Sequence, residues 1–228
     1  MKTSKFILWF ITLLALACSS DVNIDFPNNF PPNNCLPGQG AIVSENRTLA
    51  DFHSINTTIV ADIFLTQGPK EDVIIEAQQN ILDVIRTEVV NGELRLSFDR
   101  CVNILQRVKV HITIPDIKKL TITGVGDIIA QNDFDLSELN VTLTGVGDVN
   151  LRGIATMIDI TITGVGDVEA FALNTNICDI RITGVGDGEV FVNNELNVTI
   201  TGDGTVFYKG NPTITSTITG NGNVVNAN

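Results

Sequence analysis

The sequence predicts an all-β protein, a single-stranded, parallel β-helix-like solenoid of rungs of about 20 residues with an irregular β cap at its N-terminal end. The main observation is a Thr-Gly-x-Gly phrase that occurs six times in the second half of the chain, at intervals of 18 to 21 residues. A run of alternating apolar and polar residues precedes each copy, and no segment of helix length shows helical periodicity. The first glycines of the six copies are Gly124, Gly145, Gly164, Gly184, Gly202 and Gly220.

Residues 1–17 are predicted to be a signal peptide. Lys2 and Lys5 precede an apolar run from Phe6 to Ala17, which is too short for a membrane-spanning helix. Small residues, Cys18 and two serines follow, an order that favours a bacterial lipoprotein in which Cys18 is acylated. Cleavage after Ala17 by ordinary signal peptidase is the alternative, and both routes export the chain.

Residues 18–40 are predicted to be a linker, because prolines and asparagines crowd positions 27–37 and prevent regular structure. Without residues 1–17 the chain has 12 basic and 26 acidic residues, a net charge of −14, since the removed segment holds two lysines and no acid. Nucleic acids and anionic headgroups require a basic surface. We therefore expect no nucleic-acid partner, and contact with a membrane only through the lipid anchor.

Residues 41–115 are predicted to be the irregular β part of one domain that spans residues 41–228. Asn91-Gly92 lies between two β-branched runs and predicts a hairpin with a type I′ turn, and residues 78–86 suit one helical turn. Ile59–Ile63 matches Gly124–Ile128 with both glycines replaced. We interpret this segment as a degenerate first rung, so that residues 41–115 cap the same solenoid.

Residues 116–228 are the repeats. Leu120 and Ile122 are expected to face the core, and Thr121 and Thr123 to face solvent. A second short strand follows each turn, and a polar loop is expected to return the chain to the next rung.

The cysteines fit an oxidising compartment. With Cys18 acylated, we expect a disulfide between Cys35, just before the first β segment, and Cys101, at the end of the segment that precedes the repeats. Cys178 would then be a small buried apolar residue. Three free thiols are the alternative.

Several segments occur in a distinctive order between the exported N-terminus and the Gly-x-Gly-Asp turns. They are Arg47–Ile55, Leu65–Gly68, Val73–Ala77, Asn91–Leu94 and Val108–Pro115. Together they resemble the family described as putative auto-transporter adhesin, head GIN domain, over roughly residues 41–225. The resemblance implies a β-helix-like fold in exported proteins of Gram-negative bacteria, and it brings no catalytic residues.

Four aspartates, Asp127, Asp148, Asp167 and Asp187, occupy the same place in consecutive rungs. Rungs stack about 4.8 Å apart, so neighbouring carboxylates would repel by about 1 kcal/mol in water. We expect each carboxylate to accept hydrogen bonds from backbone N–H groups of its own glycine turn. The alternative is a Ca²⁺ site that bridges the carboxylates. No other metal and no cofactor is expected.

Two further columns follow the same period. Val125, Val146, Val165 and Val185 separate the glycines and are expected to pack inward or against one another. The alternative is that they point outward and form an apolar ridge, which would be a contact surface. Thr-x-Thr pairs precede the glycines and face outward, with Arg181 as the one interruption before Thr183.

Catalysis is not expected. His53 and His111 lie on separate strand-like segments without a matching nucleophile, and Gly-Val-Gly-Asp lacks the residues of a phosphate loop. We therefore predict a non-catalytic adhesion or binding module, lipid-anchored in the cell envelope as an outer-membrane lipoprotein of a Gram-negative bacterium. Its partner would be a glycan or protein of the cell surface, and it could form a homo-oligomer. The alternatives are a polysaccharide-active β-helix enzyme and a purely structural envelope protein that self-associates.

Overall fold

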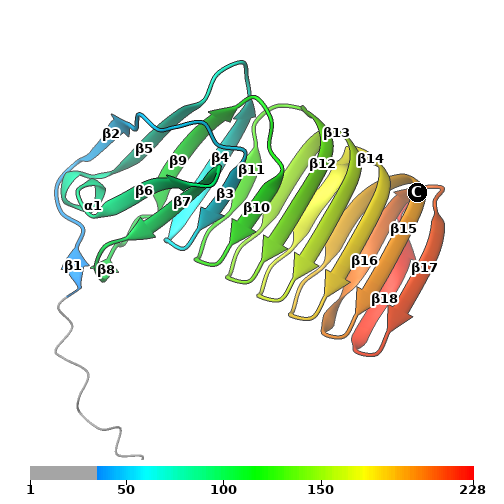
Figure 1. Cartoon of the computed structure of the whole chain (residues 1–228). Helices are drawn as coiled ribbons and strands as arrows, with labels where there is room; N and C mark the ends of the chain where they lie inside the picture. Colours follow the sequence, from blue (N-terminus) through cyan, green and yellow to red (C-terminus); the bar gives the residue numbers. More distant parts are fainter. Residues whose placement is uncertain (1–34) are drawn as a thin grey trace, which may run out of the picture. The chain divides into compact units, whose positions relative to one another are not determined.

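The computed structural model describes residues 35–228, which form one compact unit (Figure 1). The predicted signal peptide, Cys18 and the linker up to residue 34 lie outside the described residues. Residues 35–40, assigned above to the linker, belong to the compact unit and include strand β1 (Leu36–Pro37).

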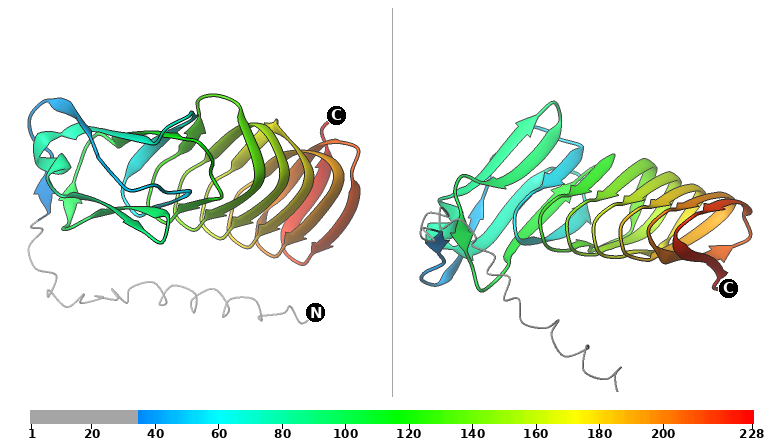
Figure 2. Two further views of the ribbon diagram at one scale, coloured as in Figure 1. Left: turned by 45° about the horizontal axis from the view of Figure 1, so that its top comes forward. Right: turned by 90° about the horizontal axis from the view of Figure 1, so that it is seen from below.

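The repeats stack as parallel rungs, and Figure 2 shows the stack from two further directions. Equivalent residues of neighbouring rungs lie opposite each other, for example Leu120 with Val141 and Val141 with Ile160. The predicted parallel β-solenoid is therefore confirmed. Its strands are β10 (Lys119–Ile122), β11 (Ile128–Ala130), β12 (Phe134–Leu143), β13 (Val149–Ile162), β14 (Val168–Ile182), β15 (Gly188–Ile200), β16 (Asp203–Gly210), β17 (Thr213–Ile218) and β18 (Asn221–Asn226).

The chain returns between rungs as strand in the middle of the stack, so the expected polar loop is wrong there. β13, β14 and β15 are 14, 15 and 13 residues long and run from one glycine turn to the next. Irregular register between β13 and β14, and between β14 and β15, marks where they bend. Continuous pairing satisfies backbone groups that a loop would leave to water.

The degenerate first rung is present. β3 (Ser54–Thr57) and β4 (Ala61–Gln67) pair in parallel with β10 and β11, and Val60 bridges to Val125. One more parallel layer precedes it, because β7 (Glu93–Phe98) pairs with β3 and β9 (Val108–Ile114) pairs with β4. The solenoid therefore extends further into the N-terminal part than the glycine pattern indicates.

Antiparallel strands close this end. β6 (Ile85–Val90) pairs with β7, β5 (Asp72–Gln78) pairs with β9, and β2 (Ile42–Asn46) pairs with β5. The predicted helical turn is α1 (Gln79–Leu82). Within the described part of the chain, no helix has the length and apolar character that a bilayer crossing requires. The antiparallel strands cover a sheet edge that would otherwise be free to pair with another chain.

Two local features fix the cap. Asn91 and Gly92 have φ values of 54° and 74°, the positive angles that a type I′ hairpin turn between β6 and β7 requires. Cys35 and Cys101 form a disulfide with a Cα–Cα distance of 4.5 Å, the pairing expected from the sequence. It ties β1 to β8 (Val102–Asn103), which pairs with it in parallel.

The core is a set of aliphatic columns, with Thr121 and Thr123 on the outside as predicted. Burying each such side chain contributes about 1.5–3 kcal/mol. The members of two columns are each at most 2% exposed; they are Leu120, Val141, Ile160, Ile180 and Val198, and Ile122, Leu143, Ile162, Ile182 and Ile200.

Both glycines of the turn are needed for the rungs to stack. A Cβ atom on Gly145 would overlap the carbonyl oxygen of Gly124 in the preceding rung. A Cβ atom on Gly147 would overlap the carbonyl oxygen of Gly126, and Gly147 also has a φ of 145°, which L-residues with side chains avoid. Any larger residue would push the rungs apart.

Gly147→Ala should therefore destabilise the protein by about 3 kcal/mol or more, because strain in φ and overlap with backbone add together. Gly40→Ala is the matched control, since Gly40 has a φ of 88° but no atom within 4 Å of the added Cβ, and it should cost only about 1 kcal/mol. Thermal unfolding followed by circular dichroism measures both. Equal losses of melting temperature in the two variants would show that overlap between rungs does not contribute to the destabilisation.

Candidate binding surfaces

The aspartate column is a ladder of hydrogen bonds between rungs. The N–H of Asp148 donates to Oδ1 of Asp127 at 3.0 Å, that of Asp167 to Asp148 at 2.8 Å, and that of Asp187 to Asp167 at 2.7 Å. The expectation that each carboxylate caps its own turn is wrong, because the donor lies in the following rung. These charge-assisted bonds offset the repulsion between stacked carboxylates.

Both ends of the ladder are also bonded. Arg107 donates to Asp62 at 2.7 Å and to Asp127 at 3.2 Å, and its hydrogen bond with Asp62 is the main cause of the raised pKa of its guanidinium. At the other end the N–H of Thr205 donates to Oδ1 of Asp187 at 2.6 Å. Residues 35–228 contain no group of three or more His, Cys, Asp or Glu side chains arranged to hold a metal ion. The ladder thus has a structural role, because it links consecutive rungs by hydrogen bonds.

The threonines directly before the first glycine of each turn, among them Thr144, Thr163 and Thr183, form the threonine column, and their hydroxyls also form hydrogen bonds with the backbone. The Thr144 hydroxyl donates to the carbonyl oxygen of Ile122 in the preceding rung at 3.0 Å, and Thr163 and Thr183 repeat this contact at 3.4 and 3.5 Å. These hydroxyls therefore strengthen contacts between rungs, and they are only partly available to a ligand.

The valine column points into solvent, so the prediction of inward packing is wrong. Val125, Val146, Val165 and Val185 are 38%, 49%, 51% and 54% exposed. Their backbones form a chain of parallel bridges that runs from Val60 to Asp203. The glycines on either side bring the backbones together and leave no room for the valine side chains between rungs, so these project outward. We call Val60, Val125, Val146, Val165 and Val185 the valine ridge.

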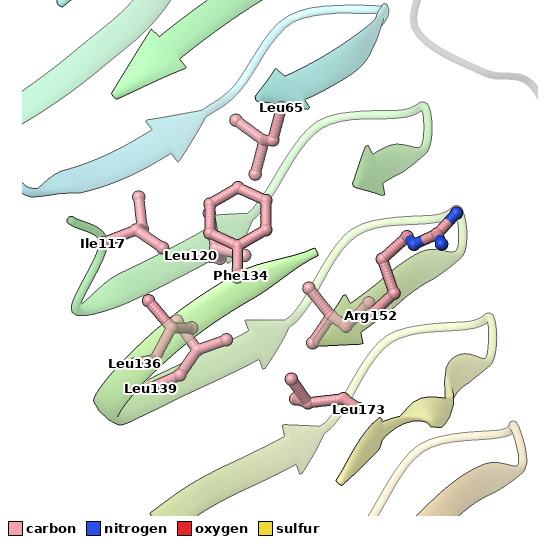
Figure 3. Close-up of a pocket in the computed structure, with 9 residues that line it drawn as sticks. Leu65, Ile117, Leu120, Phe134, Leu136, Leu139, Arg152 and Leu173 are labelled. Carbon is pink, nitrogen blue, oxygen red and sulfur yellow. The ribbon is translucent and has the colours of Figure 1, made fainter. Parts of the chain in front are cut away.

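The interior offers no ligand site near the start of the repeats. A cavity of about 10 Å³ is lined by leucines, Ile117 and Phe134, with Arg152 as its polar neighbour. Figure 3 shows these lining residues as sticks. That volume admits about one water molecule. It is a packing defect of the core.

The other residues singled out in the sequence have local partners. His53 Nδ1 lies 3.1 Å from the Ser54 hydroxyl, whereas His111 stacks on Phe64 with ring centroids 5.0 Å apart. Cys178 is fully buried, and burial raises the pKa of its thiol, so it is an inert member of the core.

An open groove of about 250 Å³, not predicted from the sequence, lies on the outer face of β13, β14 and β15. Asp159, Asp179 and Arg181 supply its charges, and Asn197, Thr161 and Thr199 complete its polar lining. The available signal was the register position five residues before the first glycine, where Asn140, Asp159, Asp179 and Asn197 follow one another.

Calcium should not change the stability of this protein, because the ladder carboxylates already accept backbone hydrogen bonds. Melting temperatures in EDTA and in millimolar Ca²⁺ should agree within about 1 °C. A rise of several degrees in Ca²⁺, absent with Mg²⁺, would instead assign a specific cation site to the aspartate column.

Comparisons with known proteins agree with this architecture. The model of the family described as "Putative auto-transporter adhesin, head GIN domain" matches residues 51–212. No curated protein matches the chain.

Solved structures share the fold. A "putative adhesin" from Bacteroides fragilis is 26% identical with a TM-score of 0.70, and the match covers 84% of this chain and 99% of that one. A "putative lipid binding protein" from Parabacteroides distasonis and a "putative adhesin" from Parabacteroides merdae are each 20% identical, with TM-scores of 0.58 and 0.53 and coverage of 85% and 99%. The family model spans most of the described unit, including the degenerate rung and five of the six glycine turns. This chain belongs to the head GIN domain family of auto-transporter adhesin-like proteins.

Proposed function

We propose that this protein is an exported, non-catalytic adhesion module, held on the outer membrane by a lipid on Cys18. The family and the B. fragilis neighbour, both described as adhesins, support a role at the cell surface. The order of basic, apolar and small residues before Cys18 supports export and acylation. The prolines and asparagines that follow would serve as a spacer between the membrane and the solenoid.

The valine ridge is the observation that carries the adhesive role. At the same turn position the next two rungs hold Asp203 and Asn221, and those turns form equally well. The fold therefore does not require valine between the glycines. An exposed apolar column on a strongly acidic protein costs solubility, and such patches mark contact sites.

The geometry of the ridge suits an extended partner. Its five valines lie on consecutive rungs, so they span about 19 Å at about 4.8 Å per rung. The aspartate column runs beside them on one side and the threonine column on the other. Regular solenoids commonly bind partners along such long, rigid surfaces.

Non-catalytic action is supported by the family description, which names an adhesin, and by the local partners of the two histidines. The acidic surface also argues against the basic cleft that cleavage of acidic polysaccharides needs.

Acylation predicts that the full chain, expressed in a Gram-negative host, incorporates labelled palmitate and fractionates with the outer membrane. The Cys18→Ala variant should incorporate no label and should leave the membrane fraction. Processing of the wild-type chain after Ala17 without label would instead support the signal peptidase alternative.

The ridge predicts that the triple variant Val146→Asn, Val165→Asn, Val185→Asn loses binding to immobilised matrix proteins by about tenfold or more. Asparagine is accepted at this turn position at Asn221, so each change should alter stability by only about 0.5 kcal/mol. Ile154→Asn is the control, because Ile154 is 54% exposed and lies off the ridge. Equal binding by the triple variant and the wild type would exclude the valine ridge as the binding surface.

Self-association is the second candidate. In the sheet, β17 pairs with β15 alone and β18 with β16 alone, and Ile214 and Ile218 are 37% and 39% exposed. Strands with one free edge can pair with a second copy. This candidate predicts that the molar mass measured by light scattering doubles as concentration rises to about 100 μM, whereas a constant monomer mass would exclude it.

A further inference from the structure

The open groove on β13, β14 and β15 combines acceptors and donors that the fold leaves unpaired. Its lining residues lie four to six positions before the residue between the two glycines of each rung, so it is separate from the valine ridge. Asp159 and Asp179 occupy the same register on adjacent strands, as do Thr161, Arg181 and Thr199 on three successive strands. These strands, β13, β14 and β15, lie side by side in Figure 1. The groove therefore spans three rungs.

One of its two carboxylates lacks a donor. Asn197 Nδ2 donates to Oδ1 of Asp179 at 2.8 Å and to Glu195 Oε1 at 2.8 Å. No equivalent amide serves Asp159, whose carboxylate accepts no hydrogen bond from the described residues. Partial burial, followed by the charge of Asp179, raises the pKa of Asp159, as expected for a carboxylate with few donors.

The arginine of the groove is likewise unpaired. Arg181 takes the register position that holds Thr121, Thr142, Thr161, Thr199 and Thr217 in the other rungs. It forms no ion pair with the described residues. Its guanidinium is exposed and retains all its donors for a ligand.

The fold needs neither the acidic pair nor the arginine. Asn140 and Asn197 occupy the register of Asp159 and Asp179, and threonines replace Arg181 elsewhere, while the strands pair in the same way. The Asp159 and Asp179 carboxylates repel each other, and the charge of Arg181 offsets this only in part, because the pKa of Asp159 stays raised. These three residues therefore call for an explanation other than stability.

The combination selects the chemistry of the ligand. A cationic group would meet Arg181, and an anionic group would meet Asp159 and Asp179. Vicinal hydroxyls can donate two hydrogen bonds to one carboxylate and at the same time accept from a guanidinium. We propose that this groove binds an uncharged, polyhydroxylated glycan through Asp159, Asp179 and Arg181.

The test uses residues 19–228, which contain the whole described unit. The probes are immobilised neutral glycans (mannan, laminarin, xylan and cellohexaose), an anionic glycan (polygalacturonate), a cationic one (chitosan) and a lysine-rich peptide. The variants are Asp159→Asn with Asp179→Asn, and Arg181→Thr, each of which introduces a residue that the chain already uses at that register. The controls are Glu88→Gln and Lys70→Thr, exposed sites on other parts of the chain.

At least one neutral glycan should bind the wild type, and its affinity should fall by about tenfold or more in both groove variants and not in the controls. The triple variant of the valine ridge should keep this binding, so failure of the adhesive ridge and failure of the glycan groove are distinguishable. Three outcomes overturn the proposal. They are the absence of binding to every neutral glycan, neutral-glycan binding that both groove variants retain, and binding only to the cationic probes, lost with the aspartates but not with Arg181.

Discussion

The close approach of backbone to backbone at the glycine turns is the constraint on which this structure depends. Each turn places the glycine of one rung against the carbonyl group of the rung before it, where a Cβ atom would overlap. The N–H groups of Val146, Val165 and Val185 donate to carbonyl oxygens of Gly124, Gly145 and Gly164, each at 3.0 Å. Because the turns stack at the spacing of a β-sheet, both flanking strands can pair in register along the solenoid.

This stacking explains what the surface columns do. Identical residues of neighbouring rungs lie one rung spacing apart. The side chains of each polar column therefore need hydrogen-bond partners or, where they are charged, a residue of opposite charge. The aspartates accept the N–H of the next rung, the threonines donate to the carbonyl of the previous rung, and Arg107 neutralises one end of the acidic column. At the valine ridge and in the groove around Asp159, the stacking of rungs does not require the residues that are present. These two surfaces are therefore the candidates for binding.

The repeats could be predicted because their strands and turns are determined by residues that lie close together in the sequence. Alternation at Leu120–Thr123 identified the core face, and the recurrence of Gly-x-Gly identified the turn. The degenerate rung at Ile59–Ile63 was visible because it keeps the same pattern without the glycines. The layer formed by β7 and β9 could not be predicted from the sequence, because its two strands are separated along the chain and no Gly-x-Gly turn connects them. The direction of the valines and the donors to the aspartates also depend on contacts between rungs, which a single repeat does not contain.

Amide hydrogen exchange tests the central claim most directly. If stacking of the glycine turns holds the rungs together, the amides of Val146, Val165 and Val185 should exchange as slowly as those of the core strand β14, although their side chains are half exposed. Gly40, in the segment before β2, provides the fast reference. Exchange of the three valine amides at the rate of Gly40 would show that the turns are open in solution, and it would contradict this account of the fold.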